Sequence, residues 1–236
     1  MKQKFLNLIL FVSVLLLQMP AWAGPGSKLL LKIVGGLAQN GMERMSDAQQ
    51  DEATRRQEEI GRFAAEQMKD FEDEQTRQKV FYFGRKAIWP GIEAMERGDR
   101  DKAASVLEPE VTKRNPVAEF YLGKIWFSNG QKARKDQGKL LLLRSAGKGF
   151  VPAQIFVGQQ YLSLGTTAFR EKAFFWFLIS KKCSKYLVSF FNQGTSDYQP
   201  DLDAAASQTA NLEKILGIDA QVASKKKVES WRPDPL

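Results

Sequence analysis

Between residues 118 and 184 this chain repeats one pattern of residues with a period of 35. The recurring positions carry an identical or chemically similar residue in both copies: Ala118 and Ala153, Gly123 and Gly158, Trp126 and Tyr161, Gly130 and Gly165, Asp136 and Glu171, Leu142 and Phe177, Ser145 and Ser180. A fixed period of this length is typical of stacked supersecondary units, because each unit buries its apolar face only against its neighbours. The period reaches back to Asp101, which lies 35 positions before Asp136, and this predicts an earlier, degenerate unit.

Each copy of the repeat predicts two antiparallel helices. We expect helix A over 116–129 and 152–164, and helix B over 136–147 and 170–183. A proline stands at the start of each helix A, where its missing N–H costs nothing. Gly123 and Gly158 lie in mid-helix, where glycine costs about 1 kcal/mol relative to alanine, so we expect close helix crossings there. Gly130 and Gly165 are expected to end helix A in a left-handed conformation.

Carboxylates and a proline indicate where helix B begins in the two copies and where its counterpart in the earlier unit ends or bends. Asp136 and Glu171 are placed near the starts of this helix, where a carboxylate interacts favourably with the helix dipole. In the earlier unit Leu107 is in register with Leu142. Pro109 predicts that the second helix of that unit ends or bends early.

The repeated pattern resembles the Sel-1-like repeats, which are relatives of the tetratricopeptide repeats. The second copy carries the residues typical of that family: Ala153, Gly158, Tyr161, Gly165, Glu171, Lys172, Ala173 and Trp176. The first copy departs from the family pattern, with Gln137 and Gly138 in place of Lys-Ala and Leu141 in place of the aromatic residue. The resemblance covers about residues 91–184. It implies an all-α fold, namely a short α-solenoid of antiparallel helix pairs forming a superhelix, with extra N-terminal helices.

Residues 1–23 have the features of a secretory signal peptide. Lys2 and Lys4 precede the apolar run 5–19, Pro20 breaks the run, and Ala21-Trp22-Ala23 supplies the small residues that a signal peptidase requires. A run of about 15 residues is short for the roughly 20 needed to cross a bilayer. We therefore expect cleavage after Ala23 and an exported protein, with the periplasm favoured and secretion left open.

Residues 24–80 are expected to form an N-terminal helical region. The apolar stretch 29–37 is interpreted as a helix packed on the repeats, or as a membrane-surface or partner-docking helix. A capping-box pattern beginning at Ser46 predicts a long helix over about 47–78. The residues of one face of that helix recur at spacings of three and four. This spacing is too irregular for sustained heptads, and pairing of this face with a partner helix as a coiled coil is left open. This face consists of Ile60, Phe63, Ala64, Gln67, Met68 and Phe71.

The remaining chain divides into a repeat region and a C-terminal cap. We assign residues 81–200 to the Sel-1-like repeat region and residues 201–236 to capping helices and a tail. Helices are expected over 201–216 and 219–231, because a repeat array needs a polar-faced cap over its last apolar surface. Lys225-Lys226-Lys227 on the last helix is interpreted as a solvated face or an anion-binding patch.

The composition excludes several classes of catalytic and metal site. The chain contains no histidine and one cysteine, Cys183. Ser-His-Asp catalysis, Cys-His catalysis and histidine-dependent zinc sites are therefore excluded. With no phosphate loop or dinucleotide motif either, we predict no catalytic residue, no cofactor and no metal site. For Cys183 we expect a buried or idle thiol, and pairing with another chain is left open.

The net charge of the chain is +8, and it would be +6 without Lys2 and Lys4 of the signal peptide. In an exported protein we do not expect this positive charge to bind nucleic acid. An anionic envelope surface or an acidic protein patch are the candidate partners, beside a merely solvated surface.

The resemblance implies protein–protein interaction rather than catalysis. We expect an adaptor or scaffold in the cell envelope, whose concave face, made by the A helices, binds a peptide or partner helix. The candidate partner-binding residues are those expected to be exposed on helix A: Glu119, Lys124, Gln154, Gln159 and Gln160. The alternatives are an enzyme acting on the cell wall, or a secreted factor binding a host surface. The identity of the partner and the oligomeric state are left open.

Overall fold

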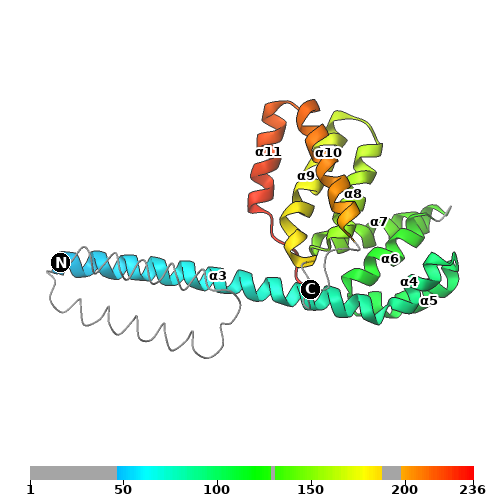
Figure 1. The fold of residues 1–236 in the computed structure, drawn as a ribbon, viewed down its shortest axis with the longest axis horizontal. Helices are drawn as coiled ribbons and strands as arrows, with labels where there is room; N and C mark the ends of the chain where they lie inside the picture. The colour runs from blue at the N-terminus through cyan, green and yellow to red at the C-terminus, as the bar shows by residue number, and fades with distance from the viewer. Residues whose placement is uncertain (1–46, 129–130, 188–197) are drawn as a thin grey trace. The chain divides into compact units, whose positions relative to one another are not determined.

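The computed structural model describes residues 47–128, 131–187 and 198–236. These residues form nine α-helices and one short 3-10 helix, so the prediction of an all-α fold is confirmed (Figure 1). The chain divides into two compact units, residues 1–71 and 72–236. The expected signal peptide, the apolar stretch 29–37 and the capping residue Ser46 lie outside the described residues.

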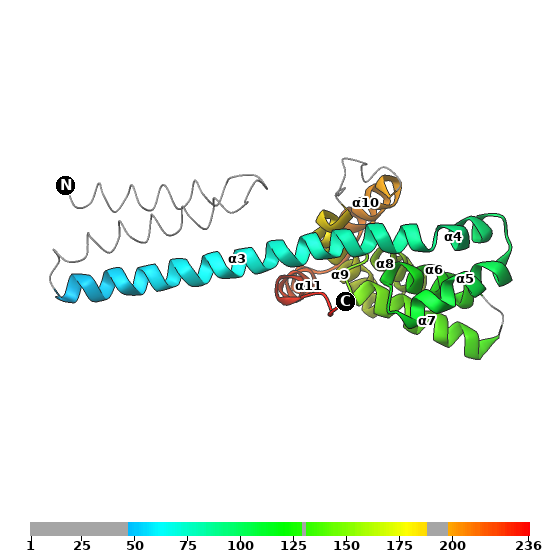
Figure 2. The same ribbon diagram turned by 90° about the horizontal axis from the view of Figure 1, so that it is seen from below.

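The helices follow one another with short connections. Their bounds are α3 (Asp47–Ala87), α4 (Trp89–Glu96), α5 (Arg100–Thr112), α6 (Pro116–Phe127), α7 (Lys132–Gly147), α8 (Val151–Ser163), α9 (Thr167–Cys183), η1 (Ser184–Leu187), α10 (Gln199–Ile215) and α11 (Ile218–Ser230). From α4 to α9 each helix packs on the next one in the chain. In Figure 2, α5 lies alongside α4. The last two helices differ, because α10 and α11 both pack on α9.

The repeat corresponds to two helix pairs, α6 with α7 and α8 with α9. Helix A follows the prediction closely. In the first copy, α6 is capped by Asn115, whose side chain accepts hydrogen bonds from the N–H groups of Val117 (3.0 Å) and Ala118 (3.4 Å). Gly165 follows α8 with φ +77°, the left-handed conformation expected there. Its counterpart Gly130 lies outside the described residues.

Helix B begins earlier than expected, so the placement of Asp136 and Glu171 near its starts was wrong. α7 starts at Lys132 and α9 at Thr167, which puts both carboxylates in the second turn. The hydroxyl of Thr166 caps α9 by accepting a hydrogen bond from the N–H of Phe169 (3.4 Å). In the first turn of α7, the Arg134 guanidinium lies 4.7 Å from the centre of the Trp126 ring.

Glycines bring the helices of the first pair close together, as expected from Gly123. A methyl group on Gly123 would lie 2.9 Å from Cγ of Leu142, and one on Gly138 would lie 2.7 Å from the carbonyl oxygen of Gly123. The two copies differ at the second position, since Ala173 stands 35 positions after Gly138. The glycine of the first copy therefore reflects a crossing too close for a side chain.

Pro109 does not end the helix of the earlier unit early, so that alternative of the prediction was wrong. α5 continues through Pro109 and ends at Thr112, the position equivalent to Gly147, where α7 ends. Pro109 is exposed, so the backbone bond that it removes costs less than it would in the core. Leu107 is fully buried, as its register with Leu142 predicted.

The long helix α3 extends nine residues beyond its expected end and includes the expected boundary at residue 80. In the first unit, its predicted apolar face is exposed at Ile60, Phe63, Met68 and Phe71. In the second unit the helix joins the core through Phe81, whose ring lies 5.3 Å from that of Phe150. Across the described ranges, no helix has both the length and the apolar character needed to cross a membrane.

Candidate functional site

Two of the five residues expected to be exposed on helix A are fully buried. Glu119 and Gln154, which occupy equivalent positions of α6 and α8, each have 0% exposure. Their selection as exposed partner-binding residues was therefore wrong, because both side chains form hydrogen bonds inside the fold. Lys124 and Gln160 are half-buried and Gln159 is exposed.

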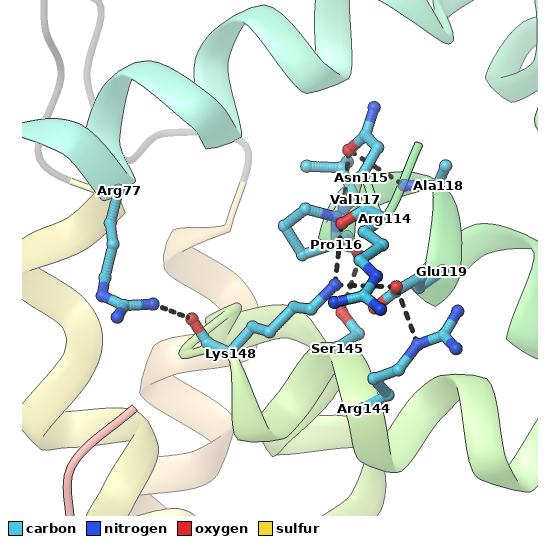
Figure 3. A network of polar contacts seen from close by, with 10 residues as sticks. All are labelled: Arg77, Arg114, Asn115, Pro116, Val117, Ala118, Glu119, Arg144, Ser145 and Lys148. Carbon is cyan, nitrogen blue, oxygen red and sulfur yellow. Dashed lines mark hydrogen bonds and ion pairs between the residues drawn. The ribbon is translucent and has the colours of Figure 1, made fainter. Parts of the chain in front are cut away.

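Glu119 is the centre of a buried polar network (Figure 3). Its Oε1 accepts hydrogen bonds from Nζ of Lys148 and Nε of Arg144, both at 2.8 Å. Lys148 is 5% exposed and also donates to the carbonyl of Arg114 at 2.7 Å. Ser145 donates to the carbonyl of Pro116 at 2.7 Å. These contacts join the start of α6 to the end of α7.

Arg77 connects the network to α3. Its Nη1 donates to the Lys148 carbonyl at 2.7 Å, and its Nε donates to Oδ2 of Asp73 at 2.8 Å. Its guanidinium lies 5.7 Å from the centre of the Tyr186 ring. Burial raises the pKa of Tyr186 to about 12. The printed contacts of this network all lie within one unit and hold α3, α6 and α7 together, and Oε2 of Glu119 is buried without a hydrogen-bond partner.

The second repeat has an amide and a thiol at the corresponding place. Gln154 Nε2 donates to the Ala146 carbonyl at 3.0 Å and contacts Sγ of Cys183 at 3.5 Å. Cys183 is buried, as expected, and burial raises its pKa to about 11. A thiol with so high a pKa is a poor nucleophile near neutral pH.

The accessible candidates lie on one surface formed by α6 and α8. We define the A-helix face as Lys124, Phe127, Phe156, Gln159 and Gln160. The rings of Phe127 and Phe156 meet edge to face with centres 5.9 Å apart. Lys124 Nζ lies 5.3 Å from the Phe120 ring centre and 5.9 Å from that of Phe156, so it bridges the two helices.

The aromatic members of this face were not among the predicted site residues. Phe127 and Phe156 are half-buried. A signal was present in the sequence, because Phe156 precedes Gln159 and Gln160 by three and four positions and so shares their side of the helix. Lys135, whose Nζ lies 5.4 Å from the Phe127 ring centre, extends the surface onto α7.

In the parts of the chain that the structure describes, no three residues among His, Cys, Asp and Glu form a group that could hold a metal ion. The chain matches no family model, no curated protein and no solved structure significantly.

Proposed function

We propose that the protein is an exported adaptor that binds a protein partner of the cell envelope through the A-helix face. The observation that carries this proposal is the repetition of an accessible polar position, Lys124 on α6 and Gln159 on α8, beside half-exposed aromatic rings. A surface of this kind combines apolar area with groups that fix orientation. Aromatic residues are enriched at protein interfaces.

We further propose that the helix pairs are Sel-1-like repeats arranged as a short α-solenoid, with the A-helix face on its concave side. Support comes from the order of the helix pairs and from the glycine at equivalent crossings. A methyl group on Gly158 would lie 2.7 Å from Cε1 of Phe177, as one on Gly123 would approach Leu142. Solenoids bind extended segments or helices on such surfaces.

Site-specific photocrosslinking in living cells tests the binding surface. A photoreactive amino acid at Gln159 should give a discrete adduct with one envelope protein, and the same residue at exposed Ser207 on α10 should not. Phe156→Ala should weaken the adduct at Gln159 while the circular dichroism spectrum stays helical. Equal adducts from both positions would contradict a role for this face.

The proposed export has a separate test. The chain is expressed from Met1, and the periplasmic fraction is collected by osmotic shock. N-terminal sequencing should begin at Gly24. A chain that keeps Met1 and stays with the membranes or the cytoplasm would contradict cleavage after Ala23, whatever the photocrosslinking shows.

A further inference from the structure

Among the described residues, Lys124 of the A-helix face and Lys135 beside it have no carboxylate partner. Lys124 and Lys135 make ring contacts with Phe120, Phe156 and Phe127. A lysine over an aromatic ring keeps its charge and N–H donors available for an anion. Both ammonium groups contact the same edge-to-face ring pair, so they lie beside one apolar surface.

The charge balance of the surrounding helices is strongly positive. Residues 116–163 carry seven Lys and Arg against two carboxylates, Glu119 and Asp136. Glu119 is buried with Arg144 and Lys148, and Arg134 lies 4.0 Å from Glu108 of α5. The other charged residues of this range are four lysines and one carboxylate, namely Lys124, Lys132, Lys135, Lys139 and Asp136. An excess of one charge on a surface favours a ligand of the opposite charge.

We infer that the A-helix face takes a partner segment that carries Asp or Glu side chains beside an aromatic or aliphatic one. The apolar side chain would pack on Phe127 and Phe156, and the carboxylates would accept hydrogen bonds from Lys124 and Lys135. The inference rests on the proposed function and names the chemistry of the partner. A neutral apolar segment would leave both ammonium groups without an anion, and a basic one would be repelled.

A displayed library of random dodecapeptides tests this preference. The full chain, expressed from Met1 so that any processing is the cell's own, is immobilised and panned. The selected peptides should be enriched in Asp and Glu next to Phe, Trp, Leu or Ile. They should bind the Lys124→Glu, Lys135→Glu double variant at least tenfold more weakly, and panning on that variant should select Lys and Arg instead.

A matched control separates local from overall charge. Lys226→Glu with Lys227→Glu changes the net charge equally on exposed positions of α11 and should leave binding unchanged. All variants are first checked for native thermal unfolding. The inference is overturned if the selected peptides lack carboxylates or bind both double variants alike. It is also overturned if a single-stranded oligonucleotide binds the protein more tightly than the selected peptides do. If the selected peptides also bind Phe156→Ala undiminished, the proposed function fails with it.

Discussion

Nζ of Lys148 lies 2.8 Å from Oε1 of Glu119, and the residues 35 positions later, Cys183 and Gln154, meet at 3.5 Å. The same place in two consecutive repeats is therefore occupied by an ion pair and then by an amide and a thiol. Both contacts join helix A to the end of helix B. The repeat conserves the position of this link while its chemistry changes.

Removing one partner of the ion pair should be strongly destabilising. Lys148→Met leaves the Glu119 carboxylate buried with Arg144, whose side chain is 48% exposed. Breaking a buried ion pair in this way costs about 3 kcal/mol, because the remaining charge stays out of water. Urea unfolding of wild type and variant measures the loss.

The control for this prediction replaces both charges. Glu119→Gln with Lys148→Met imitates the neutral pair of the next repeat and should recover much of the lost free energy of unfolding. Arg144→Gln, at the exposed edge, should cost about 1 kcal/mol or less. A double variant no more stable than Lys148→Met alone would contradict the account.

The helical repeat was predictable, because its period and its glycines are local signals. The start of α7 was not, since its first turn is held by contacts such as that of Arg134 with Trp126. The A-helix face was predicted in part. Lys124 and Gln159 are accessible, whereas burial of Glu119 depends on Lys148, which lies 29 residues away in the sequence.

Gly138→Ala should destabilise the protein by about 3 kcal/mol. The added methyl group would lie 2.7 Å from the Gly123 carbonyl, and a backbone contact of this kind is relieved only by separating α6 from α7. Thermal unfolding by circular dichroism measures the effect. Gly61→Ala is the matched control, because no atom lies within 4 Å of its added methyl group. Alanine there should raise helix stability by up to about 1 kcal/mol.

Stability should fall in alkaline solution because of Cys183. Burial raises its pKa from 9.0 to about 11, so the unfolded chain loses this proton at a lower pH than the folded chain. The stabilisation is complete below pH 9 and is lost as the pH rises toward 11. By pH 10 the loss from this group is about 1 kcal/mol. Cys183→Ala should show a smaller decrease between pH 8 and 10 in urea unfolding, and identical slopes would contradict this assignment.

Arg77 should control the attachment of the second-unit part of α3. The side chain is 4% exposed, and Arg77→Met would leave the Lys148 carbonyl without its donor and Asp73 without its cation. Loss of hydrogen bonds that involve a charged group costs about 2–3 kcal/mol. Because the lost contacts hold one helix, amide hydrogen exchange over residues 72–87 should accelerate more than exchange in α8 and α9. Lys86→Met, an exposed change on the same helix, should leave that exchange near the wild-type rate. An equal acceleration in all helices would indicate that Arg77 supports the whole unit instead of the attachment of α3.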